Sequence, residues 1–90
     1  MERITGPRSG YFIAAYTQGV GDGRFMGHAC ICLHRPATAA EAKALERVAS
    51  RGIYDSEEKA LHAAEFQAKS IIESLRPNWS PFTEPGKSQL

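Results

Sequence analysis

The sequence predicts an α+β protein of two layers, in which an antiparallel sheet of two or three strands packs on one long C-terminal helix. One amphipathic helical pattern lies toward the C-terminus, and two strand-like runs joined by a glycine-rich turn precede it. An isolated hairpin is at best marginally stable in water, so we expect the sheet to bury one face against the helix.

The helix is predicted over residues 55–76. Asp55 precedes Glu58 by the spacing of a capping box, which makes Asp55 the expected N-cap. Pro77 disfavours helical geometry at Arg76 and sets the expected end. The face expected to be buried consists of Leu61, Ala64, Ala68, Ile71, Ile72 and Leu75, at steps of three and four. The neighbouring polar strip consists of Glu58, His62, Glu65, Lys69 and Glu73.

Phe66 breaks this helical pattern. At the helical repeat it lies about 140° from Leu61, outside the apolar face and among polar neighbours. Two interpretations stay open. Either the ring is covered by the C-terminal segment or exposed without consequence, or it anchors another subunit or protein, since aromatic residues are enriched in interface cores.

Two runs before the helix predict strands. Residues 11–17 are rich in aromatic and β-branched side chains, and residues 25–33 form a second apolar run. Between them, residues 19–23 contain three glycines and an Asp-Gly pair, a strong hairpin signal. A phosphate-binding glycine loop is not expected, because Arg24 occupies a position that this motif reserves for glycine and a strand follows.

Residues 38–54 allow two interpretations. Thr38 and Glu41 have capping-box spacing, and residues 39–45 have high helix propensity. Residues 47–54 follow neither the helical nor the strand period. We expect a short helix or irregular connection followed by a third strand, or else a longer helix through Ala49.

Residues 28–34 carry side chains of the types that bind zinc. Alternation along a strand places four of them on one face: His28, Cys30, Cys32 and His34. Same-face neighbours are about 6.7 Å apart, so the two histidines lie about 20 Å apart and all four cannot reach one ion. We therefore predict no metal, no cofactor and reduced thiols.

The strand face that carries these thiols is expected to point away from the helix. Without a cover, this face would expose both thiols and Met26 to water. We therefore expect a cover, either the C-terminal segment around Trp79 and Phe82 or a second subunit. The residues expected to bind a partner are Phe66, Met26, His28, His34 and Trp79.

Length and composition indicate one ordinary globular domain. The chain has 90 residues, of which 42% are apolar and 23% charged. We expect a flexible N-terminus over residues 1–9, the domain over residues 10–76, and a proline-rich segment over residues 77–90, disordered from residue 84. No run approaches the roughly 20 apolar residues of a membrane span, and no secretory signal is visible. Cytoplasmic location is expected.

Charge is distributed unevenly along the chain. The net charge of +1 divides into +3 over residues 1–54 and −2 over residues 55–90. This slight asymmetry suggests an alternative function, weak binding of nucleic acid or another anion through the basic sheet half. The expected contacts are Arg24, Arg35, Arg47 and Arg51.

Residues 52–60, Gly-Ile-Tyr-Asp-Ser-Glu-Glu-Lys-Ala, follow a Gly-Asp-Gly-Arg-Phe hairpin. With these motifs, residues 10–76 resemble short bacterial domains of uncharacterised function, in which a β-meander feeds a long C-terminal helix. That arrangement is similar to the double-stranded-RNA-binding domain and implies a fold more than an activity. True RNA-binding members present lysines at the start of the last helix, where Asp55, Glu57 and Glu58 would repel phosphates.

Signals for catalysis are weak. Serines and histidines occur, but none lies in a nucleophile elbow or another recognisable catalytic context. A domain of this size rarely encloses a pocket for a small-molecule substrate without a partner. We therefore predict a small interaction module that is not an enzyme and self-associates through its open sheet face or the Phe66 side of the helix.

Overall fold

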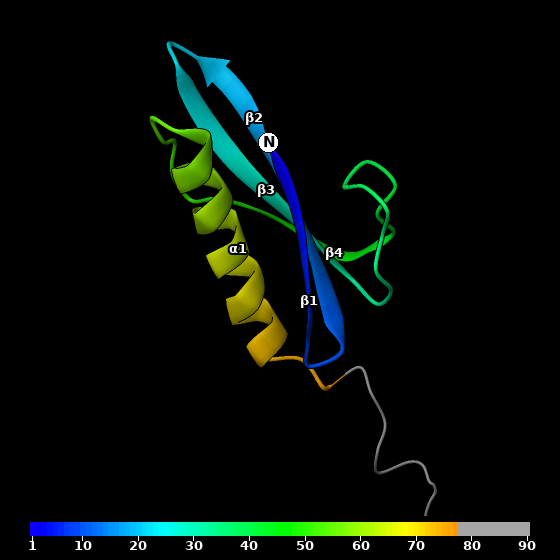
Figure 1. The fold of residues 1–90 in the computed structure, drawn as a ribbon. Coiled ribbons are helices and arrows are strands. Elements are labelled where there is room, and N and C mark those ends of the chain that lie inside the picture. The colour runs from blue at the N-terminus through cyan, green and yellow to red at the C-terminus, as the bar shows by residue number, and fades with distance from the viewer. Residues whose placement is uncertain (78–90) are drawn as a thin grey trace, which may run out of the picture.

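The computed structural model describes residues 1–77, which form one sheet and one helix. In chain order the elements are β1 (Glu2–Arg8), β2 (Tyr11–Gly21), β3 (Arg24–Cys32), β4 (Ala44–Ala49) and α1 (Glu57–Glu73). The strands form an antiparallel meander in the order β1-β2-β3-β4, and α1 lies along one side of it (Figure 1). The predicted α+β architecture is confirmed, with four strands in place of two or three.

The extra strand comes from the N-terminus. Residues 2–8, expected to be flexible, form β1, in which Ile4 lies opposite Ala14. Ser9 and Gly10 connect β1 to β2 with φ values of 53° and 82°. Asp22 and Gly23 connect β2 to β3 with φ values of 54° and 66°. Paired positive φ values match the right-handed twist of a hairpin, so Ser-Gly at 9–10 is the same kind of signal as Asp-Gly at 22–23.

Residues 38–54 contain a strand. β4 pairs with β3, Val48 lying opposite Ala29, so the longer helix through Ala49 is wrong. The expected third strand is β4, and it begins at Ala44, within the run of high helix propensity. Residues 38–42 form tight turns, in which the Glu41 and Ala42 amides donate to the Thr38 and Ala39 carbonyls, each at 3.2 Å.

The helix is shorter than predicted at both ends. Its N-cap is Ser56, whose Oγ accepts a 3.1 Å bond from the Lys59 amide, and the expected N-cap Asp55 instead pairs with the Lys59 ammonium at 3.1 Å. At the other end, Ser74 caps the helix and its hydroxyl donates to the Ile71 carbonyl at 2.7 Å. The chain thus leaves the helix before Arg76.

The layer between α1 and the sheet is built from small residues. Ala15 and Ala29 on the sheet face Ala64 and Ala68 on the helix, all at most 1% exposed. A Cβ at Gly27 would overlap the Ala60 carbonyl oxygen and lie 2.9 Å from the Ala64 Cβ. The predicted buried helix face is confirmed, since Leu61, Ala64, Ala68 and Ile72 are buried while Ile71 and Leu75 are partly buried against them.

The other sheet face is covered at one end by the chain itself. Cys30 and Cys32 are each 1% exposed and pack with Ala14, Ala39 and Ala42. The segment between β3 and β4 lies on the side opposite α1 (Figure 1). A cover over the thiols was expected from the C-terminal segment or from a second subunit, whereas the structure shows residues 39 and 42 covering them. Trp79 and the proposed C-terminal cover lie outside the described residues.

We expect Gly27→Ala to lower the free energy of unfolding by about 1–3 kcal/mol, because the added methyl group pushes α1 away from β3. Urea denaturation measures the change. Gly19→Ala in the adjacent strand is the control, since a Cβ there meets nothing within 4 Å, and its effect should stay within about 0.5 kcal/mol. Equal effects at the two glycines would contradict the close contact between helix and sheet.

Candidate functional site

The flank between β1 and α1 is occupied by ion pairs. Arg3 donates from Nε to Glu65 Oε2 at 2.9 Å and from Nη2 to Glu65 Oε1 at 2.8 Å, and its Nη1 lies 3.6 Å from Glu58. The bond to Glu65 raises the pKa of the Arg3 guanidinium above its ordinary value. Glu65 belongs to the predicted polar strip of the helix, but only 9% of its side chain is exposed, and Arg3 of β1 binds its carboxylate.

The acidic start of α1 is engaged in the same way. The Thr17 hydroxyl donates to Glu57 at 2.7 Å and the Met1 amino group at 3.0 Å, and these bonds lower the pKa of the Glu57 carboxyl below its ordinary value, Thr17 contributing most. Glu58 also contacts the His62 ring at 2.6 Å. The carboxylates of Glu57 and Glu58 are therefore already bound to groups of the same chain.

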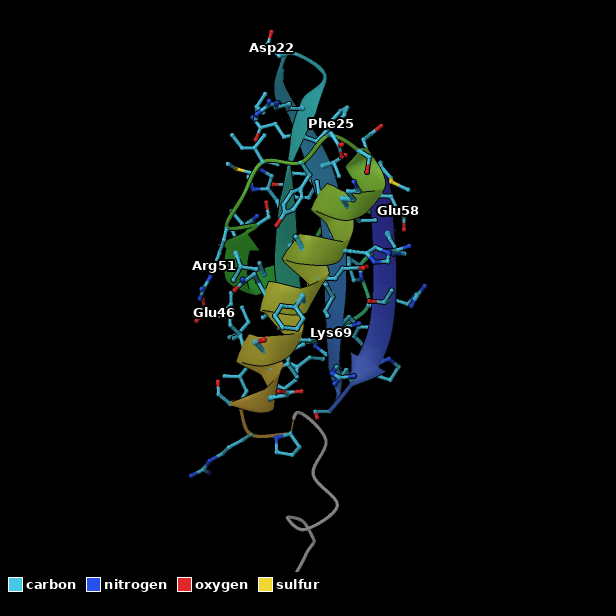
Figure 2. The ribbon with its side chains drawn as sticks, turned by 90° about the vertical axis from the view of Figure 1, so that its left-hand side faces the viewer. Asp22, Phe25, Glu46, Arg51, Glu58 and Lys69 are labelled. Carbon is cyan, nitrogen blue, oxygen red and sulfur yellow. The ribbon has the colours of Figure 1, made fainter. Side chains whose placement is uncertain are left out.

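Phe66 lies on the outer surface of α1, with 67% of the residue exposed. Beside it is a shallow hollow lined by Thr5, Gly6 and Pro7 of β1 and by Ile13 of β2, together with the charged side chains of Arg3 and Glu65; it continues over α1 toward Arg51. Figure 2 shows Glu58 and Lys69 on the β1 side of the helix and Arg51 near β4. An exposed aromatic ring thus adjoins a concave surface.

The residues expected to bind a partner do not form one surface. Met26 and His28 lie on the sheet face opposite α1, since the alternate residues Gly27 and Ala29 face the helix. Phe66 lies on the helix side. His34 follows the end of β3 and is exposed, and Trp79 lies outside the described residues.

The four arginines proposed as anion contacts are also dispersed. Arg47 lies opposite Cys30 of β3. Cys30 is six residues from Arg24 along the strand, so Arg24 and Arg47 lie about 20 Å apart. Arg35 lies beyond the other end of β3. Arg51 follows β4 and lines the hollow on the helix side. The structure does not bring these four side chains into one patch.

The uncovered part of the sheet face carries an aromatic pair. Tyr16 and His28 lie opposite each other and stack with ring centroids 5.0 Å apart and an interplanar angle of 18°. His28 Nε2 donates to Gln18 Oε1 at 2.8 Å. A shallow pocket beside the pair reaches Arg47 and Ala49, and Arg47 Nη1 lies 3.3 Å from Cys30 Sγ. The sequence signals single out His28 but not its partner Tyr16.

The two cysteines are free and buried. Burial raises the pKa of the Cys32 thiol, and neighbouring Cys30 raises it further. Within residues 1–77, no three histidine, cysteine or acidic side chains are gathered as a metal site would require. The same residues contain no helix that is long and apolar enough to cross a bilayer.

No protein-family model, curated protein or solved structure matches this chain.

We expect Arg3→Met to lower the free energy of unfolding by about 1–3 kcal/mol, because it leaves the buried Glu65 carboxylate without its charged donor. Thermal or urea denaturation measures the change. Arg8→Met is the matched control, because its 3.4 Å pair with Glu73 is exposed on both sides and should contribute less than about 1 kcal/mol. A larger effect at Arg8 than at Arg3 would contradict this account of the β1 flank.

We expect Thr17→Val to raise the pKa of Glu57 toward its ordinary value, because the strongest bond to the carboxylate is lost. A carboxyl with a lowered folded pKa stabilises the fold above its unfolded pKa, and this stabilisation is lost as pH falls through the folded pKa. Titration of the Glu57 carboxyl carbon by NMR measures the shift. Thr5→Val, on β1, removes a hydroxyl that does not contact Glu57 and should leave its pKa unchanged.

Proposed function

We propose that this chain is a small interaction module, without catalytic activity, that self-associates through the surface around Phe66. The observation that supports this most directly is the 67% exposure of Phe66, the most exposed of the large hydrophobic side chains among residues 1–77. Moving such a ring out of water on association yields about 1.5–3 kcal/mol. Aromatic side chains are also typical anchors of protein interfaces.

The alternative route to self-association, the open sheet face, has less apolar surface to offer. Cys30 and Cys32 pack under Ala39 and Ala42 of the same chain. The pocket that stays accessible on that face is lined by Arg47 and His28, and among the described residues no apolar side chain on that face is as exposed as Phe66 on the helix side. The apolar driving force for association therefore favours the helix side.

The hollow beside Phe66 suggests how two copies fit. In a twofold interface the same surface is used twice, so a projecting group and the depression that receives it must lie on one face. Phe66 and the depression lined by Thr5, Gly6 and Pro7 meet this condition. In the proposed dimer, each Phe66 ring enters the other copy's depression between β1 and α1.

The rim of this surface carries charges of both signs. Arg8 and Glu73 form an exposed pair at 3.4 Å, and the exposed Lys69 lies nearby on the β1 side of α1 (Figure 2). Across a twofold axis, the positive charges of one copy can lie next to the negative charges of the other. Such pairs fix the orientation of the two copies more than they raise the affinity of the dimer.

We expect Phe66→Glu to weaken self-association about 10- to 100-fold, because it removes the buried ring and places a charge in the interface. Sedimentation or light scattering over a range of protein concentrations measures the change. Ala40→Glu adds the same charge to the exposed turn on the other side of the sheet and should leave the mass unchanged. A wild-type chain that stays monomeric at every concentration would overturn the proposal.

We further expect Phe66→Cys mixed with Thr5→Cys to form disulfide-linked dimers of the two variants under mild oxidation. The native thiols are buried and should not compete. Mixing Ala40→Cys with Thr5→Cys is the control and should give no comparable product. If both mixtures cross-link equally, Phe66 does not occupy the partner's depression.

A further inference from the structure

The open face of the β2–β3 hairpin presents a rigid aromatic platform that the proposed self-association does not use. Tyr16 covers one face of the His28 ring, and the bond to Gln18 fixes the ring's orientation. The neighbour of His28 on β4 is Ala49, whose small side chain leaves the second ring face open. The pocket lined by His28, Arg47 and Ala49 is this opening.

A cation stands beside the platform. Within residues 1–77, Arg47 contacts the Cys30 sulfur at 3.3 Å and forms no ion pair with a carboxylate. The guanidinium N–H donors that do not contact the sulfur therefore have capacity for an oxyanion, which a guanidinium binds in a fork geometry.

A flat aromatic ring with a phosphate attached suits this combination of groups. We propose that the open face of β2–β3 binds single-stranded nucleic acid, with an unpaired base stacked on His28 and the adjoining phosphate bound by Arg47. Bases stack on aromatic side chains with little regard to sequence, and arginines follow the backbone. The site requires an unpaired base because bases within a duplex already stack on each other.

The path of the strand follows the hairpin. Along β3, Gly27 faces α1, so the alternate residues 24, 26 and 28 lie on the open face. Arg24 therefore stands on the same face as Arg47, about 20 Å away along β3, with Met26 and His28 between them. Two exposed arginines flanking a stacking platform favour a strand running along β3.

Two carboxylates lie near this path. Glu2 is opposite Tyr16 on the β1 side, away from Arg47, and its Oε1 accepts a bond from the Ala39 amide at 3.2 Å. Asp22 lies in the turn beyond Arg24. Glu46 is adjacent to Arg47 in sequence, but it pairs with Ile31 and faces the helix side. The stacking site itself contains no acidic side chain among the described residues.

Fluorescence anisotropy with short labelled oligouridylate and oligothymidylate tests the proposal. We expect both strands to bind more weakly as salt rises, and His28→Ala to weaken binding about 5- to 100-fold through the lost stacking. Arg47→Gln should weaken binding and lower the slope of log affinity against log salt by about 0.7. Arg51→Gln, an equal change of charge on the helix side, is the control and should bind like the wild type.

Tighter binding of oligouridylate than of oligothymidylate would support the proposal and identify RNA as the strand, and equal binding would support a site for either. Three results would overturn the proposal. The affinity could be independent of salt, a duplex could bind as tightly as the single strand, or uridine monophosphate could compete as well as the strand does. Circular dichroism checks whether His28→Ala folds. If it does not, Arg47→Gln still tests the site, because it changes an exposed side chain. Phe66→Glu should bind the strand normally, which separates this site from the proposed dimer surface.

Discussion

The close approach of α1 to the middle of the sheet is the constraint on which the other features depend. Gly27 leaves room for the Ala60 carbonyl, and alanines on both layers continue the contact along the helix. A helix seated this closely packs chiefly on β2 and β3, so the flanks over β1 and β4 need other means of closure. On the β1 flank the closure is electrostatic, through Arg3 and Glu65. Phe66 lies outside both the core and this closure, which is why it faces water.

These contacts change the meaning of the charge pattern. In sequence, acidic residues at the start of the helix suggest a surface that repels phosphates. In the fold, Glu57 and Glu65 bind groups of the same chain, and their side chains lie on the α1 side of the sheet. Arg47 lies on the other side without a carboxylate partner in residues 1–77. The net charges of chain segments therefore say little about the charge of either sheet face.

Much of the fold could be predicted from the sequence, because periodicity and turn chemistry are local. The spacing of Leu61, Ala64, Ala68 and Ile72 identifies the buried helix face, and Asp22-Gly23 identifies a hairpin. The partner of His28 could not be predicted in this way. A register shift between Gly19 and Gly21 moves the pairing of β2 with β3 by one residue, and such a shift decides whether Tyr16 meets His28 or faces α1. Burial of Glu65 likewise depends on a distant strand.

The two sheet faces are mechanically linked through β3, even though their proposed partners differ. Gly27 and Ala29, the neighbours of His28, both point into the helix layer. Buried Ser50 binds Gly27 on both sides, donating from its amide to the Gly27 carbonyl at 2.7 Å and accepting from the Gly27 amide at 3.0 Å. The backbone next to His28 is thus held at Gly27 both by Ser50 and by the close contact with α1. A stacking platform needs such rigidity, because the ordering of a loose ring would subtract from the binding free energy.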